Sequence, residues 1–206
     1  PIVSLLIDPD TLWDEEMGLF GNPWSINKNE AIIEMYNFGQ TIQSYDIKTR
    51  VFGSGTRLLD KKSITIFATP LISNTLFGNR NNKYIDGFIL RSVFLSKRFR
   101  NELVYDINEF MNGHVAIQEF QPAVLYINGQ YWGLYHVMER KNNEFIKAHY
   151  RSKPKNVITV HHNGFYFHKG DNQDYIKFIN KLQGIDINTK EAFEHSSKHL
   201  DINSYI

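Results

Sequence analysis

The sequence predicts an α+β fold in which strands dominate the first two-thirds of the chain and helices follow. Three observations predict it. Short apolar or alternating runs are frequent before residue 138, apolar residues at helical spacing are frequent after residue 142, and 42% of the 206 residues are hydrophobic. That apolar content is enough to bury a core. No linker rich in Pro, Gly or Ser divides the chain, so we expect one domain over residues 1–206.

The strands are expected where apolar runs end at turn sequences. Residues 2–7 form the first run, and the turn sequence Asp-Pro-Asp follows it at residues 8–10. The polar, Asn-rich segment 70–83 predicts a loop. The other expected strands cover residues 31–38, 41–52, 63–68, 86–94 and 157–160.

The clearest local prediction is a β-hairpin at Asn128-Gly129, between the apolar runs 123–127 and 130–137. Asn-Gly favours it because both residues adopt the positive φ angles of a type I′ turn. A helix is expected over residues 99–111, where apolar residues lie at helical spacing before an Asn-Gly stop. The other expected helices cover residues 142–150, 171–182 and 190–200.

Composition excludes several classes of function. The chain has no Cys, which rules out a disulfide scaffold, a Cys-ligated zinc site and a thiol nucleophile. The net charge is +1, so no nucleic-acid partner is expected. The apolar run 2–7 is far shorter than the ~20 residues that span a bilayer, so no transmembrane segment is expected. The chain carries no targeting signal, and because it begins with Pro1 we expect a preceding segment.

A basic turn is the first candidate site. Two glycines in residues 53–57 (Gly-Ser-Gly-Thr-Arg) allow close approach of an anion, and Arg57 and Lys62 can meet phosphate oxygens. The glycines complete neither a dinucleotide-binding motif nor a P-loop. A plain β-turn with a solvated basic flank is therefore the favoured interpretation from these residues alone.

Three further candidates have equally simple structural interpretations. Glu139, beside Arg140 at the end of a strand, can hold a basic residue or a metal, and an exposed ion pair is the favoured alternative. His195 and His199 have helical spacing that suits zinc, but they do not complete an H-E-x-x-H motif. The aromatic residues Trp13, Trp24, Tyr131 and Trp132 can form a binding platform, although packing is favoured.

Several segments, in order, resemble the spore-coat protein H (CotH) kinase-like family. Residues 1–14 are similar to the start of its bacterial surface members, and residues 50–63 to its basic turn followed by Lys-Lys-Ser. The most specific match is residues 122–140, which fit the family pattern P-x-x-x-x-I-N-G-x-Y-W-G-x-Y-x-x-x-E-R. Residues 90–91, 100–103, 168–175 and 201–206 also match, so the likeness spans nearly the whole chain.

The resemblance implies a protein-kinase-like fold that binds ATP with Mg or Mn and phosphorylates a protein substrate outside the cytosol. It implies a nucleotide-binding set of Arg57, Lys62, Arg100 and Glu139. Lys62 is then the strand lysine on the phosphates, with Lys61 as the alternative. Arg57 helps with phosphate charge or braces the turn, Glu139 pairs with Lys62 or faces the nucleotide, and Arg100 stabilises the same region.

One departure from the family pattern concerns catalysis. The family's N-x-D-W/G and W-D-x-D segments, which carry its catalytic and metal-binding aspartates, have no match in this chain. Phosphoryl transfer needs such groups. We therefore expect a domain truncated at its C-terminal end, with weak or absent catalysis and no catalytic residue of its own. The alternative is a non-catalytic cell-surface module that binds protein or glycan through its aromatic residues.

Overall fold

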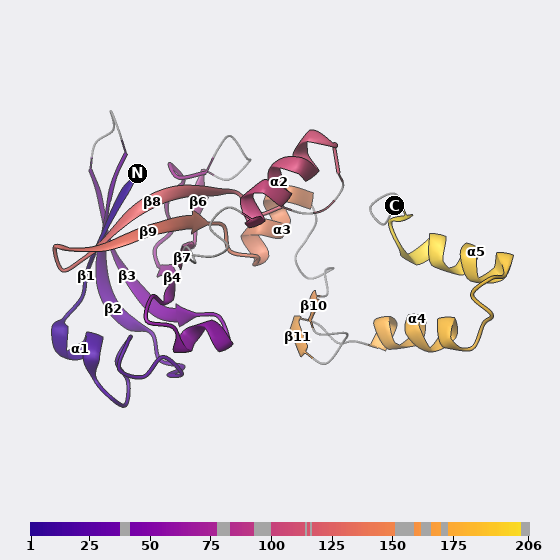
Figure 1. Cartoon of the computed structure of the whole chain (residues 1–206), viewed down its shortest axis with the longest axis horizontal. Helices are drawn as coiled ribbons and strands as arrows, with labels where there is room; N and C mark the ends of the chain where they lie inside the picture. The colour runs from indigo at the N-terminus through magenta and orange to yellow at the C-terminus, as the bar shows by residue number, and fades with distance from the viewer. Residues whose placement is uncertain are drawn as a thin grey trace. The chain divides into compact units, whose positions relative to one another are not determined.

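A computed structural model describes residues 1–37, 42–77, 83–92, 100–113, 115, 117–150, 159–161, 166–169 and 173–202 (Figure 1). The chain forms two compact units: residues 1–100 with 118–148, and residues 101–117 with 149–206. The first unit contains a strand-rich barrel and the second most of the helices, which confirms the predicted α+β class. A single domain over residues 1–206 stays a prediction.

The first unit is built on a closed seven-stranded barrel with the order β1-β2-β3-β4-β7-β9-β8. Neighbouring strands are antiparallel except β1 and β8, which are parallel and close the barrel. The strands are β1 (Ile2–Leu6), β2 (Asn29–Tyr36), β3 (Gln43–Phe52), β4 (Ser63–Ala68), β7 (Ile89–Ser92), β8 (Phe120–Ile127) and β9 (Gln130–Met138).

The period-two burial pattern of a half-buried strand is present in β1, β3 and β8, whereas the first four residues of β4 are all buried. In β3, for example, the buried Ile47, Thr49 and Val51 alternate with more exposed neighbours. One face of each strand therefore points inward, and the apolar side chains on it form a single cluster. Its fully buried members include Val3, Leu5, Ile33, Ile64, Leu90, Leu125 and Tyr135.

The predicted hairpin is confirmed, and it connects distant parts of the barrel. Asn128 and Gly129 have φ angles of 50° and 78°, as a type I′ turn requires. The Asn128 side chain also pairs with Ile7: Oδ1 accepts from the Ile7 N–H at 2.9 Å, and Nδ2 donates to the Ile7 carbonyl at 2.8 Å. The turn is thus fixed to the end of β1.

Local differences from the expected elements have simple causes. The sequence after β1 was expected to be a turn, but it begins the short helix α1 (Pro9–Trp13), because Asp8 is its N-cap and accepts from the Asp10 and Thr11 N–H groups. The expected loop 70–83 contains the strand β5 (Ile72–Ser73), which pairs with β6 (Tyr84–Ile85). A 3₁₀ helix, η1 (Gly55–Leu58), follows the glycine turn after β3.

The expected helices are present with shifted ends. They are α2 (Arg100–Phe110), α3 (Asn143–Tyr150), α4 (Gln173–Gln183) and α5 (Lys190–His199). Two short strands, β10 (Thr159–His161) and β11 (Tyr166–Lys169), pair with each other. Parts of the predicted elements at 38, 41, 93–99, 157–158 and 171–172 lie outside the described residues. Among the described helices, none is both long and apolar enough to cross a membrane.

Candidate functional site

The basic turn is held together by Arg57. Its Nε donates to the Gly53 carbonyl at 2.5 Å, and Nη1 donates to the Pro23 carbonyl at 3.1 Å. Its guanidinium lies 5.5 Å from the ring centroid of Trp24. Burial lowers the pKa of Arg57, and the charge of Arg50 lowers it further. Of the two roles expected for Arg57, these contacts are those of a brace that joins the turn to the segment before β2.

The two lysines that follow the turn have different partners. The Lys62 ammonium donates to the Leu59 carbonyl at 2.8 Å, within the same turn. The Lys61 ammonium donates to the Leu134 carbonyl of β9 at 2.6 Å and lies 4.7 Å from the ring centroid of Tyr135. The Tyr135 hydroxyl in turn donates to the Lys62 carbonyl at 2.9 Å. Burial raises the pKa of Tyr135, so this hydroxyl stays a donor.

Gly133 explains how Lys61 can reach β9. A Cβ atom at Gly133 would lie 2.8 Å from Lys61 Nζ, and the φ angle of Gly133 is +117°. Only glycine leaves room for the ammonium and adopts this backbone conformation without strain. Sequence reasoning missed this role of Gly133, although the Trp-Gly pair inside a strand was a visible signal of close approach.

Glu139 and Arg140 lie just after β9, and their side chains contact different partners. Glu139 Oε2 accepts from the Glu119 N–H at 2.9 Å. Arg140 forms an ion pair with Asp86, with 3.2 Å between Nη1 and Oδ2. Asn142 donates to both Asp86 carboxylate oxygens at 2.8 and 2.9 Å, and its own Oδ1 caps α3. The arrangement therefore anchors α3 to the loop before β7.

The predicted nucleotide-binding residues are only partly brought together. Arg57 and Lys62 belong to the same turn. Tyr135, which contacts Lys62, lies four residues before Glu139, the first residue after β9, a separation of about 13 Å at the rise of an extended chain. Arg100 is the exposed first residue of α2. The four-residue set stays a prediction.

The described residues contain no group of three or more His, Asp or Glu side chains that could hold a metal ion. His195 and His199 pack in a stack with Phe178, with 4.6 Å between the two imidazole centroids. His199 Nδ1 lies 2.9 Å from the His195 carbonyl. These contacts join α4 and α5 and match a structural role.

Of the four aromatic residues that could form a binding platform, one packs against the core and three are exposed. Trp132 packs against the core and stacks on Phe20, with 5.6 Å between ring centroids. Trp13, Trp24 and Tyr131 remain 56%, 52% and 63% exposed. These three are among the large aromatic side chains that the barrel unit presents to solvent.

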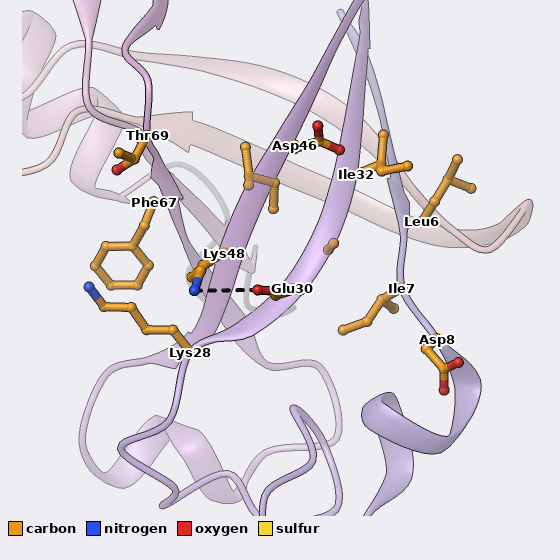
Figure 2. Close-up of a pocket in the computed structure, with 12 residues that line it drawn as sticks. Leu6, Ile7, Asp8, Lys28, Glu30, Ile32, Asp46, Lys48, Phe67 and Thr69 are labelled. Carbon is orange, nitrogen blue, oxygen red and sulfur yellow. Dashed lines mark ion pairs between the residues drawn. The ribbon is translucent and has the colours of Figure 1, made fainter.

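An open groove of about 480 Å³ lies over β1–β4 (Figure 2). Its apolar lining comes from Leu6, Ile7, Ala31, Ile32, Ile47 and Phe67, and its polar lining from Asp8, Lys28, Glu30, Asp46, Lys48 and Thr69. The volume lies within the range typical of small-molecule sites.

Comparison with known proteins identifies the family. The family model described as CotH kinase protein matches residues 49–206, a span that includes Arg57, Lys62, Arg100 and Glu139. A comparison with curated proteins finds no match. The family match covers well over half of the sequence and agrees with the resemblance in its motifs. The chain therefore belongs to the CotH kinase protein family.

Proposed function

We propose that this chain is the nucleotide-binding part of a CotH-type protein kinase that acts outside the cytosol. The observation that carries the proposal is the family match over residues 49–206. Within that span, the side chain of Lys61 reaches β9 and that of Lys62 bonds back to the basic turn. A protein-kinase-like arrangement of the barrel unit, a nucleotide ligand and a protein substrate are all parts of this proposal.

Lys62 supports the proposal best. Its ammonium has three N–H donors, and its one described hydrogen bond, to Leu59, occupies one of them. The side chain is half-buried, so the remaining donors are accessible from one side. We assign the phosphate contact to Lys62, with Lys61 as the alternative, and we assign the shape of the turn to Arg57. ATP supplies the phosphoryl group for transfer.

The roles of Arg100 and Glu139 remain those that the family pattern implies. Glu139 is hydrogen-bonded to the main chain at Glu119, which suits a residue that fixes the end of β9. Because the described residues gather no metal-ligand cluster, we assign no residue to the Mg or Mn that accompanies ATP. The family's aspartate segments have no match here, so we propose that these 206 residues bind nucleotide but transfer phosphate weakly or not at all.

A second candidate function is a non-catalytic surface module for protein or glycan. The exposure of Trp13, Trp24 and Tyr131 favours it, because exposed large aromatics are common at binding sites. This function would not need the lysines of the turn.

A thermal-shift measurement with ATP and Mg²⁺ or Mn²⁺ tests the proposal. At a nucleotide concentration 100 times Kd, binding adds about 2.7 kcal/mol to the folded state. For a chain of this size we expect a rise in Tm of about 5–10 °C. The rise should disappear in Lys62→Ala and persist in Lys61→Ala.

The two variants are matched controls because their lysines are neighbours with the same charge. Loss of the shift in Lys61→Ala alone would move the phosphate contact to Lys61. No shift for the unaltered chain, or an undiminished shift in both variants, contradicts nucleotide binding at this turn and favours the aromatic module.

A further inference from the structure

We propose that the groove over β1–β4 is a second binding site, for a small ligand with an oxyanion head and a short apolar tail. The head is a phosphate or a carboxylate, held by Lys28, which lines the groove, and by Arg50, which lies beside Phe67 but outside the groove lining. The tail lies over the apolar lining from β1 and β2. This site is separate from the proposed nucleotide turn and does not rest on it.

Four cations surround the outward face of Phe67. The distances from the Phe67 ring centroid are 4.2 Å to Lys28 Nζ, 4.7 Å to Arg140 Cζ and 5.8 Å to Arg50 Cζ. Lys48 lies directly across the strand pair from Phe67. The sequence brings them together because β3 and the segment before β2 both present basic residues on the same outer face.

Only two of the four cations have a carboxylate partner among the described residues. Lys48 pairs with Glu30 at 3.4 Å, and Arg140 pairs with Asp86 at 3.2 Å. No described carboxylate pairs with Lys28 or Arg50. Asp46 also lines the groove, on the same face of β3 as Lys48. The four cations and the three carboxylates Glu30, Asp46 and Asp86 therefore leave an excess of one positive charge, which an oxyanion would neutralise.

A second observation, independent of the charge count, favours an anionic ligand beside Arg50. Its Nε is buried and has no hydrogen-bond partner in the described part of the chain. Its Nη1 makes one long contact, 3.4 Å, to the Ile26 carbonyl. A buried donor without a partner is unfavourable, and a contact of that length holds the guanidinium weakly. A ligand oxygen could satisfy this buried donor if the guanidinium turned to expose it, and such a turn would break one described hydrogen bond, the long contact to Ile26.

The groove also fixes the orientation of the ligand. Lys28 and Phe67 lie on one side of it, whereas Asp8 lies on the opposite side, beyond Ile7 (Figure 2). An anionic head is attracted to the first side and repelled by Asp8. Leu6 and Ile32, on the side of the groove away from Lys28 and Phe67, are partly exposed and can cover an apolar chain (Figure 2). The chemistry of the lining thus matches an acid with an alkyl tail rather than a bare anion.

The test is a calorimetric titration of the whole chain with three probes that share one tail: octanoate, octyl phosphate and the uncharged octyl glucoside. At least one of the two charged probes is expected to bind more tightly than octyl glucoside, and the tighter of them identifies the preferred head. Arg50→Met and Lys28→Met should each weaken that binding about tenfold or more, the usual effect of losing a charged hydrogen bond. Lys147→Met removes an equal charge from the exposed pair with Glu144 on α3 and should leave the affinity unchanged.

Stability gives a second readout for Arg50. Because its Nε has no partner, Arg50→Met should unfold at the same temperature as the unaltered chain or higher. The ATP-induced thermal shift should be the same in Lys28→Met as in the unaltered chain, so failure of this proposal is distinguishable from failure of the nucleotide proposal. Equal affinity for all three probes, or charged-probe binding that survives both substitutions, would overturn the oxyanion site.

Discussion

Replacing Gly87 by alanine is expected to destabilise the barrel unit by more than about 3 kcal/mol. Gly87 has a φ of +125°, and an added Cβ would overlap the Ile66 carbonyl oxygen. That oxygen accepts from the Phe88 N–H at 3.2 Å, and Ile66 N–H donates back to Phe88 at 2.8 Å. The substitution therefore combines backbone strain with a steric clash, and it separates β4 from the segment that leads into β7.

Two other glycines act as controls for this result. Gly55→Ala meets no atom within 4 Å and no positive φ, so the free energy of unfolding should change by less than about 0.5 kcal/mol. Gly129→Ala also meets no atom within 4 Å, but its φ of +78° should cost about 1 kcal/mol. Urea unfolding followed by tryptophan fluorescence measures all three. A Gly87→Ala chain as stable as Gly55→Ala would contradict the close packing of β4 against Gly87.

Replacing Arg140 by methionine is expected to cost about 2–3 kcal/mol of unfolding free energy. The Arg140 and Asp86 side chains are only 20% and 35% exposed, and burial lowers the pKa of Arg140 while Asp86 acts against that shift. Without the guanidinium, the Asp86 carboxylate keeps only the Asn142 amide among its described side-chain partners. A half-buried charge without its counter-ion is unfavourable.

A double-mutant cycle separates this pair from general damage to the fold. Asp86→Asn combined with Arg140→Met removes both charges, so the double variant should be less destabilised than the sum of the single variants. Lys48→Met breaks the exposed pair with Glu30, whose side chains are 54% and 84% exposed, and should cost at most about 1 kcal/mol. Additive single effects at Asp86 and Arg140 would show that the ion pair contributes nothing specific.

The elements that were best predicted from the sequence are those that depend on residues close together in the chain. Asn128-Gly129 specifies its turn without help from the rest of the chain, and the hairpin followed. The residues Asp-Pro-Asp at 8–10 are compatible with a turn and with a helix start. The helix forms because the Asp8 side chain caps its N-terminus. The parallel pairing of β1 with β8 joins residues 2–5 to residues 124–127, and no local pattern encodes such a pairing.

Prediction of the candidate site was limited in the same way, because its contacts join residues that are far apart in the sequence. The basic turn was recognisable because its charges and glycines are close in sequence. The partners that give each side chain its task are distant: Arg140 meets Asp86 across 54 positions, and Lys61 meets Leu134 across 73. Arg50 belonged to a recognised motif, yet its unpartnered Nε beside Phe67 depends on the register of β3 against β4. Sequence motifs can therefore indicate candidate residues, but the pairing register of the strands determines which of these residues are in contact.

The most direct measurement of the central claim is a calorimetric titration of the chain with ATP–Mg²⁺ and, separately, with adenosine. If the lysines after the turn contact phosphates, ATP should bind at least about tenfold more tightly than adenosine, because charged hydrogen bonds to phosphate supply most of the difference. Higher salt should weaken the binding of ATP more than that of adenosine. Equal affinities, or no detectable binding of ATP, would contradict the assignment of this turn to a nucleotide.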